Sequence, residues 1–412
     1  MNILFLVPYV PNLIRVRPYN LIRNLSKLGH NIKLLTLWSS QEEIGAIKEL
    51  ENDGIEVVAA RLPKTLSYWN CLKSLPTNTP LQAVYCWNPL LVKYMIETVR
   101  NQSKMGPIDV VHIEHLRGAK YGVYLKEHLK AAGNNAPPIV WDSVDSISHL
   151  FRQTVEKTES RFSRIITNLE LGRTEKFEQY LVDQFDKVLV TSKVDKGSFE
   201  AFGASENGKT VVLTNGVDLN YFTPNPNEER ELATIIVSGK LSYHANVSMV
   251  LYLLKEIMPL IWRSRPEIRV WVVGKDPPGI IREYNQPPQI EVTGTVPDLR
   301  LYLQRATVAV APITYGAGIQ NKVLEAMACS TPVVCTSKAV SALEFITEKE
   351  VVVKDSPEEF AGAVLKLLDN VKLSQGIGEM GRRYVEKHHD WANISIKLEN
   401  IYRQLLESNN PS

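Results

Sequence analysis

The chain has 412 residues, which is longer than a single hydrophobic core usually supports, so about two domains are expected. Its 47 basic and 45 acidic residues leave a formal net charge of +2, which gives no global reason to bind nucleic acid. The four cysteines lack metal-ligand spacing, and no apolar run approaches the roughly 20 residues of a spanning helix. Because the first residues form a strand pattern rather than a signal peptide, we expect a cytoplasmic protein with at most peripheral membrane contact.

Short apolar runs alternate with helical stretches along the first half of the chain. These runs are 3–7, 31–36, 55–58, 110–112, 138–141 and 187–191. A second series of the same kind comprises 233–237, 269–273, 290–292, 308–311, 332–334 and 351–353. Such alternation is typical of a doubly wound parallel sheet. The sequence therefore predicts an α/β protein with two Rossmann-like domains.

The segment between the two series is rich in Asn, Gly and Pro, which indicates a turn followed by a linker. We place the domain boundary near Pro224. The predicted domains are then 1–223 and 224–384. Whether the last helical segment, about 385–412, packs back on the first domain is left open by the sequence.

A glycine-rich segment follows the strand-like run 308–311 and leads into a helical pattern. Gly316 and Gly318 at this turn would let a ligand approach the backbone closely. The first turn of the following helix offers free N–H groups and the positive end of the helix dipole, which suit a diphosphate. Lys322 adds a full charge, and Glu325 is placed to accept hydrogen bonds from ribose hydroxyls. An ordinary βα turn is the alternative explanation of the glycines.

Several phrases in the correct order resemble the retaining glycosyltransferases of family 4, which have the GT-B fold of two facing Rossmann-like domains with an interdomain cleft. The matching phrases are 213–218, 237–247, 272–274, 292–303 and 318–334. The first is similar to the phrase before the interdomain linker of the family, and the last to its nucleotide-sugar motif. Within the family the chain is most similar to bacterial sugar transferases of exopolysaccharide and other surface-glycan clusters, which also share the phrase Arg17-Pro-Tyr-Asn20.

This resemblance implies transfer of a sugar, with retention of configuration, from a nucleotide diphosphate sugar to a hydroxyl. The acceptor would be a sugar, a lipid-linked glycan or a small molecule. No Asp-x-Asp motif is present, so no metal or other cofactor is expected, and lysines and amides must stabilise the leaving diphosphate. The donor-binding residues that the phrases imply are Gly239, Lys240, Gly274, Thr295, Val296, Gly316, Gly318, Ile319, Gln320, Asn321, Lys322 and Glu325. Catalytic roles are assigned to His115, Lys240, Lys322 and Glu325.

The chain departs from the family pattern at one carboxylate. The family has two glutamates separated by seven residues; Glu325 occupies the second place, whereas Ala317 occupies the first. The usual partner of the sugar hydroxyls is therefore absent, and we expect the N–H groups of Gly318 and Ile319 to replace it.

The chain also departs from the family at a basic pair. Lys240 stands for the first member, but Asn246 lies near the usual place of the second. We expect Lys322 to supply the missing charge.

The phrase His112-Ile-Glu114-His115 follows a predicted strand in the first domain, at the sheet edge where open α/β sheets bind ligands. In the related transferases this loop supplies a polar group near the sugar, often a histidine. His115 is our first choice and His112 the alternative, with Glu114 on the acceptor side. A hydrogen-bonded structural histidine is the competing interpretation, and a zinc site lacks an evident third ligand.

Asp142 and Asp145 follow the next predicted strand. Either could position the acceptor or accept its proton, or cap the helix that follows; we favour capping for Asp145. Arg15 and Arg17 lie after the first strand and could hold a phosphate of the donor or of a lipid-linked acceptor. A basic helix start exposed to water is the alternative.

The segments 64–73 and 85–88 mix aromatic and basic residues. They could lie on a membrane surface or line an acceptor groove. We favour buried helix packing over both of these interpretations.

Two other classes of function remain. One is a different GT-B enzyme, such as a sugar-nucleotide epimerase or a phosphorylase. The other is a non-catalytic nucleotide-sugar-binding protein, which is suggested by Ala317 in place of a carboxylate. A few loop residues decide the sugar, the base and the acceptor, so the sequence does not name them.

Overall fold

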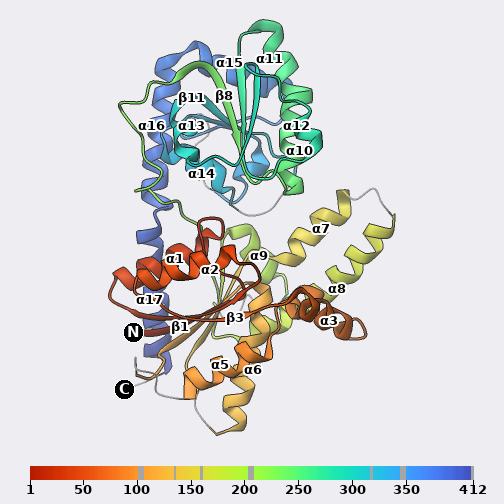
Figure 1. The fold of residues 1–412 in the computed structure, drawn as a ribbon, viewed down its shortest axis with the longest axis vertical. Helices are drawn as coiled ribbons and strands as arrows, with labels where there is room; N and C mark the ends of the chain where they lie inside the picture. The colour runs from red at the N-terminus through yellow and green to blue at the C-terminus, as the bar shows by residue number, and fades with distance from the viewer. Residues whose placement is uncertain are drawn as a thin grey trace. The chain divides into compact units, whose positions relative to one another are not determined.

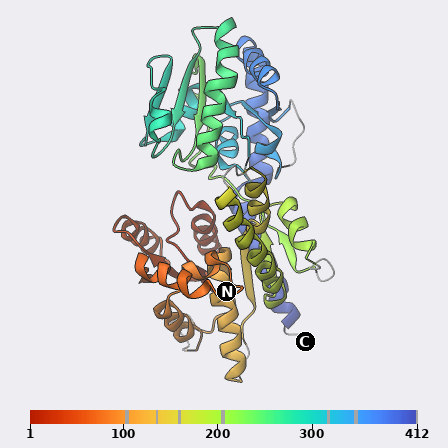
Figure 2. The same cartoon turned by 90° about the vertical axis from the view of Figure 1, so that its right-hand side faces the viewer.

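The structure is a computed structural model that describes residues 1–100, 106–133, 136–157, 161–202, 208–315, 319–343 and 349–409. The chain forms two compact units. Unit 1 comprises Met1–Thr214 and Trp391–Ser412, and unit 2 comprises Asn215–Asp390. Each unit is a parallel sheet with helices on both of its faces (Figures 1 and 2).

The sheet of unit 1 has seven strands in the order β3-β2-β1-β4-β5-β6-β7. Their bounds are β1 Asn2–Val7, β2 Asn31–Trp38, β3 Glu56–Arg61, β4 Val110–Glu114, β5 Ile139–Val144, β6 Lys187–Val190 and β7 Thr210–Val212. The central strands β1 and β4 pair in parallel, with Ile3 opposite Val110. The strand order reverses between them, and ligands of open α/β sheets bind outside the carboxyl ends of strands at such a point.

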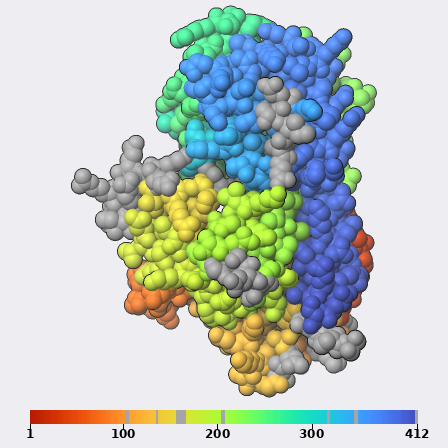
Figure 3. All heavy atoms as spheres, turned by 180° about the vertical axis from the view of Figure 1, so that it is seen from behind, coloured from red at the N-terminus to blue at the C-terminus, as the bar shows by residue number. Residues whose placement is uncertain are grey.

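Ten helices belong to unit 1 among the residues that the structure describes. They are α1 Val16–Lys27, α2 Glu42–Asn52, α3 Lys64–Ser74, α4 Leu81–Tyr85, α5 Pro89–Arg100, α6 His115–Ala131, α7 Ile147–Lys157, α8 Arg161–Gln184, α9 Lys193–Glu200 and α17 Trp391–Asn409. The last of these packs beside α1, with Ile394, Leu398 and Tyr402 in one cluster with Phe5 and Leu21. Figure 3 shows α17, in dark blue, at the surface of unit 1. The C-terminal helix that the sequence left open thus completes the first unit.

The sheet of unit 2 has six parallel strands in the order β10-β9-β8-β11-β12-β13. They are β8 Glu231–Ser238, β9 Arg269–Val273, β10 Ile290–Gly294, β11 Ala306–Ala311, β12 Val333–Cys335 and β13 Val352–Val353. Its helices are α10 His244–Tyr252, η2 Leu253–Ile257, α11 Met258–Ser264, α12 Gly279–Arg282, α13 Leu299–Arg305, α14 Asn321–Ala328, η3 Ser337–Val340, α15 Pro357–Asp369 and α16 Val371–His388. Here the strand order reverses between β8 and β11, and the carboxyl ends of strands at such a point are where open α/β sheets bind ligands.

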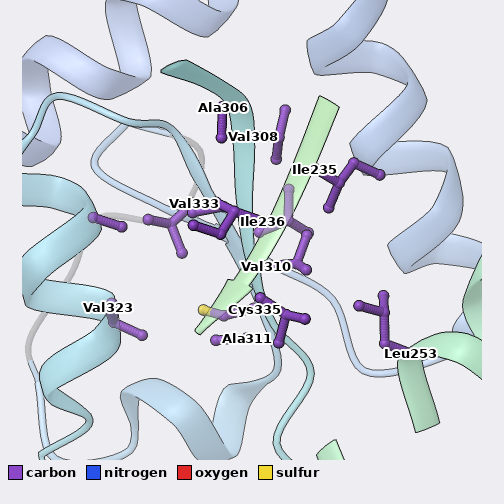
Figure 4. Close-up of a cluster of buried hydrophobic side chains, with 14 of the residues drawn as sticks. Ile235, Ile236, Leu253, Ala306, Val308, Val310, Ala311, Val323, Val333 and Cys335 are labelled. Carbon is purple, nitrogen blue, oxygen red and sulfur yellow. The ribbon is translucent and has the colours of Figure 1, made fainter. Parts of the chain in front are cut away.

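The core of unit 2 forms around β8 and β11. Ile235, Ile236, Val308 and Val310 from these strands lie close to Val323 of α14 (Figure 4). Both strands are apolar on both faces because helices cover both sides of a parallel sheet. Packing of Val323 against the sheet places the first turn of α14 at the carboxyl ends of the strands.

The predicted fold class is confirmed, and each predicted apolar run lies on an observed strand. The prediction missed β7, Thr210–Val212, because three residues give too short a pattern to recognise.

The units divide at Asn215, whereas the sequence placed the boundary near Pro224. The reason is that the intervening segment is hydrogen-bonded within unit 2. The N–H of Val217 donates to the carbonyl of His389 at 2.8 Å, and Arg382 donates to the carbonyl of Phe222 at 2.7 Å. The segment 215–224 therefore has the composition of a linker but is packed as part of unit 2.

The helical segment His244–Ser264 is the one part of the described chain that is long and apolar enough to cross a membrane. In its apolar 18-residue window 50 % of the residues are buried inside the structure, and the core helix of a soluble protein meets the same criteria. Leu253, Ile257 and Met258 of this segment lie in the core of unit 2.

Candidate active site

The carboxyl ends of β8, β9 and β10 are joined by backbone hydrogen bonds in unit 2. The N–H of Gly239 donates to the carbonyl of Val273 at 3.1 Å, and the N–H of Gly274 donates to that of Gly294 at 3.2 Å. A Cβ on Gly274 would lie 1.8 Å from the carbonyl oxygen of Gly239. Glycine is therefore required at Gly274, and the loop after β8 is held in one position.

Asn246 joins this loop to the start of α14. Its Nδ2 donates to the carbonyl of Lys240 at 2.9 Å, and its Oδ1 accepts from Nζ of Lys322 at 2.9 Å. Lys322 also donates to Oε1 of Gln320 at 3.3 Å. A Cβ on Gly239 would lie 3.2 Å from Cε of Lys322, so the lysine stem fills the space above this glycine. Asn246 stands near the place where the family often has a second lysine. Lys322, which was predicted to supply that charge, is hydrogen-bonded to this asparagine.

Lys322 and Glu325 are one turn apart on α14, and burial shifts both of their pKa values. Burial lowers the pKa of Lys322 to about 8, against the opposing effect of the Glu325 charge. Burial raises the pKa of Glu325 to about 7, against the opposing effect of Lys322. Both groups can therefore change their protonation state near neutral pH, and a bound anion would stabilise the charged lysine.

One side-chain acceptor near the start of α14 has no hydrogen-bond partner among the described residues. Gln320 is the N-cap of α14 and Ile319 is buried. Oδ1 of Asn321 is buried and has no hydrogen-bond partner in the part of the chain that the structure describes. Buried polar atoms usually have a partner, so this oxygen is available to a hydrogen-bond donor of a ligand.

The glycine-rich turn itself, Gly316, Ala317 and Gly318, lies outside the described residues. The roles predicted for Gly316 and Gly318 therefore stay predictions.

The loop after β10 lines a separate pocket of about 410 Å³. Gly294 and Thr295 contribute to it, together with Asp276, Arg282 and Asn285. Val296 instead packs against the core of unit 2. Thr295 can therefore contact a ligand, whereas the Val296 side chain supports the loop.

Sequence reasoning missed an aromatic pair at the same strand ends. The rings of His244 and Tyr315 are stacked, with centroids 5.4 Å apart, and Nδ1 of His244 lies 2.6 Å from the Tyr315 hydroxyl. The two residues follow β8 and β11, the strands between which the order reverses. That position was the signal that could have identified them, although His244 also lies within the phrase 237–247 that resembles the family.

Lys240 is exposed on the loop after β8. Its carbonyl accepts from Asn246, which fixes its backbone but leaves the ammonium in solvent. An exposed lysine can contribute charge to a diphosphate bound beside it. The role predicted for Lys240 stays a prediction, because no ligand contact of this side chain is observed.

In unit 1, Asp142 is at the centre of a buried polar cluster. Its Oδ2 accepts from Nε of Arg17 at 2.8 Å and lies 3.6 Å from Nε2 of His112. Nδ1 of His112 lies 2.7 Å from the hydroxyl of Tyr402 on α17. Burial alone would raise the pKa of Asp142, but Arg17 and His112 hold it below its usual value. Tyr402, which sequence reasoning missed, lies too far along the chain for any local pattern to reveal it.

The structure corrects the predicted position of Asp142 and excludes the alternative given for Arg17. β5 extends to Val144, so Asp142 lies within the strand and not after it, whereas Glu114 is the last residue of β4, at the carboxyl end where it was expected. Arg17 is only 4 % exposed and is not a basic helix start open to water. Buried charges persist only when paired, so this cluster holds β4, β5, α1 and α17 together.

His115 is the predicted residue of this phrase that lies just beyond its strand. It has a φ of 62°, which is uncommon for a residue other than glycine, and its ring makes an edge contact with Tyr9 at 6.3 Å. Burial lowers the pKa of His115 to about 3, so its imidazole is neutral. Unusual backbone conformations gather at functional sites, which favours His115 over the fully buried His112.

Glu114 has a buried oxygen that no residue of the described chain contacts by a hydrogen bond. Its Oε1 accepts from the Tyr9 hydroxyl at 2.9 Å, whereas Oε2 has no partner. Burial, followed by the charge of Asp142, raises the pKa of Glu114 to about 8. Glu114 is therefore largely protonated at neutral pH and can act as a hydrogen-bond donor.

The Glu114 carboxyl leads to a prediction about stability. A carboxyl whose pKa is raised in the folded state stabilises the fold below its unfolded pKa, and this contribution is lost as pH rises through the folded pKa. We expect the melting temperature to fall as pH rises from about 4.5 to about 8, because in this interval the unfolded Glu114 has lost its proton and the folded one has kept it, and to fall less in Glu114→Gln. Thermal unfolding at a series of pH values measures both slopes, and equal slopes in the two proteins would contradict the assignment.

Arg15 and Asp145 make contacts that the sequence did not indicate. Arg15 forms an ion pair with Glu43 at 2.9 Å and lies over the ring of Tyr9.

Asp145 accepts from Oγ1 of Thr191. The first N–H groups of α7 are instead capped by Glu178, which accepts from Ile147 at 2.8 Å. The capping role favoured for Asp145 is therefore wrong.

The aromatic and basic segment 64–73 forms α3. Tyr68 and Trp69 are exposed, so the favoured interpretation of buried packing is wrong for both. Trp87 is partly buried against Tyr121.

Among the described residues, no group of three or more His, Cys, Asp or Glu is placed to hold a metal ion. The expectation of a transferase without a metal or other cofactor stays a prediction.

Residues 233–370 match the family model of glycosyl transferases group 1. The match covers the strands, loops and α14 that form the unit 2 site. The sequence matches none of the curated proteins with which it was compared.

Solved structures show the same architecture over almost the whole chain. HepE from Anabaena in complex with UDP and glucose has a TM-score of 0.70 at 13 % identity, covering 98 % of this chain and 100 % of that one. Sucrose-phosphate synthase from Thermosynechococcus elongatus has a TM-score of 0.66 at 16 % identity, covering 99 % and 100 %. A variant of TarM from S. aureus, in complex with fondaparinux, α-GlcNAc-glycerol and UDP, has a TM-score of 0.62 at 12 % identity, covering 98 % and 100 %.

The TM-scores of these neighbours establish the fold. The family model indicates the class of domain in unit 2. The two doubly wound sheets correspond to the GT-B architecture predicted from the sequence. The chain therefore contains a glycosyl transferases group 1 domain, and it is a glycosyltransferase with the GT-B fold.

Proposed function

We propose that the protein transfers a sugar from a nucleotide diphosphate sugar to an acceptor hydroxyl with retention of configuration. The observation that carries the proposal is the position of the Lys322 ammonium. It is held by Asn246 at the first turn of α14, beside the loop after β8, where the strand order of unit 2 reverses. A fixed positive charge, free helix N–H groups and a crevice at strand ends are what a diphosphate requires.

On the donor side, Lys322 and the first N–H groups of α14 would stabilise the negative charge that grows on the leaving diphosphate. Lys240 would add a second charge from solvent. Glu325 would accept hydrogen bonds from the ribose hydroxyls, and Asn321 Oδ1 would accept one from a hydroxyl of the ligand. Preorganised groups of this kind are most effective in a site from which water is excluded.

On the acceptor side, unit 1 would orient the hydroxyl group through His115, with Arg15 contributing positive charge. In a front-face reaction the bond between the anomeric carbon and the diphosphate oxygen breaks, and the acceptor oxygen bonds to the same face of that carbon. The acceptor proton passes to the leaving phosphate oxygen. No strong side-chain base is then required, which agrees with the pKa of about 3 of His115, because an imidazole with so low a pKa is a weak base.

The choice of substrates to test follows from the structural neighbours. HepE has been solved with UDP-glucose, and TarM with UDP and α-GlcNAc-glycerol. UDP sugars are therefore the first donors to test. Sugars and lipid-linked glycans are the first acceptors, as in the surface-glycan branch of family 4, and such synthesis would take place in the cytoplasm.

A thermal-shift screen of UDP, GDP, ADP and TDP, each with common sugars attached, tests the proposal. A ligand that binds only the native state at a hundred times its Kd stabilises it by about 2.7 kcal/mol. We expect one nucleotide to raise the melting temperature, and the shift to be lost in Lys322→Ala and Glu325→Ala but kept in the control Lys366→Ala, which alters an exposed lysine of α15.

The proposal is overturned if no nucleotide shifts the melting temperature, or if the shift survives in both site variants. A shift without acceptor-dependent release of the nucleotide diphosphate would instead indicate the non-catalytic binding protein.

A further inference from the structure

Helix α3 has its polar face turned inward. Ser67 and Ser74 are buried, and Oγ of Ser74 donates to the carbonyl of Thr79 at 2.8 Å. Asn70 on the same face donates to the carbonyl of Trp87 at 2.8 Å. These hydrogen bonds, together with Leu66, which packs against the core of unit 1, fix the helix on this unit and leave its other large apolar residues unused.

The opposite face of α3 exposes its large apolar side chains. Tyr68 is 66 % exposed, Trp69 55 %, Leu72 53 % and the following residue Leu75 51 %. Residues three and four apart lie on the same side of a helix, so these four form one continuous strip. Isolated exposed apolar residues are ordinary, whereas a contiguous patch marks an interaction surface.

The neighbouring helix α8 extends this patch. Arg173 of α8 donates to the carbonyl of Leu75, and Oε2 of Glu170 accepts from the N–H of Leu81 at 2.8 Å. On the same helix Ile166 and Leu169 are exposed. We call the strip of α3 together with these two residues the α3–α8 patch; Figure 1 shows the two helices at one edge of unit 1.

The segment that contains α3 carries charge of one sign, and the acidic Glu170 of α8 is paired with Arg173 at 3.0 Å. The chain has 45 acidic residues, yet 57–96 contains none, whereas Arg61, Lys64 and Lys73 are basic and exposed. Nζ of Lys73 lies 5.6 Å from the centre of the Trp69 ring. A basic rim around tryptophan, tyrosine and leucine complements an anionic lipid surface, because the rings enter the interface while lysine stems keep their charges in water.

We propose that the α3–α8 patch binds the surface of a membrane that contains anionic lipids. Tyr68, Trp69, Leu72 and Leu75 would enter the boundary between headgroups and acyl chains. Lys64 and Lys73 would contact the phosphate groups. The inference concerns unit 1 alone and does not depend on the proposed transferase reaction, because the binding needs neither donor nor acceptor.

Vesicle flotation of the full chain tests this inference. We expect binding to vesicles of phosphatidylcholine mixed with phosphatidylglycerol, and much weaker binding to phosphatidylcholine alone. Lys64→Gln with Lys73→Gln should weaken binding about thirtyfold, since each basic residue contributes about 1 kcal/mol near an anionic surface. Trp69→Ser with Leu72→Ser should weaken it about a hundredfold through lost apolar burial.

The matched control carries Leu232→Ser and Val371→Ser, which remove exposed apolar side chains from unit 2 and should bind as the wild type does. Quenching of tryptophan fluorescence by brominated lipids gives a second measurement, and Trp69→Phe should lose this quenching while still binding.

Absence of binding to the anionic vesicles overturns the inference, as does binding that all variants retain. Sedimentation equilibrium supplies the remaining test. A wild-type dimer that Trp69→Ser with Leu72→Ser converts to a monomer would assign the α3–α8 patch to a second copy of the chain and overturn the membrane proposal.

Discussion

Lys322→Ala is expected to lower kcat about a hundred- to a thousandfold, the usual effect of removing one group that stabilises charge in a transition state. Nζ of Lys322 lies 2.9 Å from Asn246 Oδ1, so the ammonium is held in place before any donor binds. KM should rise as well, because the same ammonium holds the diphosphate of the bound donor, and the fall in kcat reports the additional charge that grows on the leaving diphosphate. Steady-state rates of nucleotide diphosphate release, measured with the donor that the thermal-shift screen identifies, check the prediction.

Lys322→Met separates the charge from the packing of the lysine stem. Cε of Lys322 lies 3.2 Å from where a Cβ on Gly239 would be, so alanine removes packing as well as charge. Methionine keeps most of that volume and should lose as much activity as alanine. If Lys322→Met retained near wild-type kcat, the ammonium would have no role in the chemistry.

The same lysine should set the alkaline limit of the reaction. Burial lowers the pKa of Lys322 to about 8, so the free enzyme loses this charge as pH rises through that value. We therefore expect kcat/KM to fall above about pH 8 in the wild type. In Lys322→Met this alkaline limb should be absent from the residual activity.

Gly274→Ala is expected to destabilise unit 2 by more than about 3 kcal/mol, which is at the upper end of the cost of overpacking. The new Cβ would lie 1.8 Å from the carbonyl oxygen of Gly239. That backbone cannot move away easily, because the N–H of Gly239 donates to Val273 and the N–H of Leu241 donates to Lys275 at 2.8 Å. Chemical denaturation measures the loss of stability, and donor binding should be lost with it.

Gly362→Ala is the matched control for this substitution. Gly362 lies inside α15, and a Cβ there meets no atom within 4 Å. Alanine in a helix interior is favoured over glycine by about 0.5 to 1 kcal/mol, so this variant should be slightly more stable than the wild type. A Gly274→Ala protein with wild-type stability would show that the loops after β8 and β9 are not locked together.

The order of the strands along the chain could be predicted because buried parallel strands are continuous apolar runs, which a local pattern reveals. The runs 3–7 and 308–311 lie on β1 and β11, and the start of α14 falls at Asn321, after the glycine-rich turn. The same local chemistry indicated Lys322 and Glu325, because a helix that begins after a strand-end loop presents its first turn to a ligand. The pairing of strands across the sheet is not a local property, and the choice of their carboxyl ends as the site of binding came from the general rule for open α/β sheets.

Tertiary structure alone decided which of the indicated residues are accessible. His112 and His115 are three residues apart, yet His112 is buried against Tyr402 and Asp142, whereas His115 follows the strand with an unusual backbone conformation. The same holds for α3, whose composition suits either a buried or an exposed helix. Burial depends on contacts between segments far apart in sequence, and a local pattern contains no record of them.

What the sequence by itself determined is therefore the two doubly wound sheets and the positive charge at the start of α14. Only the tertiary structure decided that Arg17, His112 and Asp142 form a buried cluster closed by Tyr402, and that Asn246 holds Lys322. The physical reason is that secondary structure follows from the periodicity of neighbouring side chains, whereas the accessibility and charge state of a side chain depend on what the folded chain places around it.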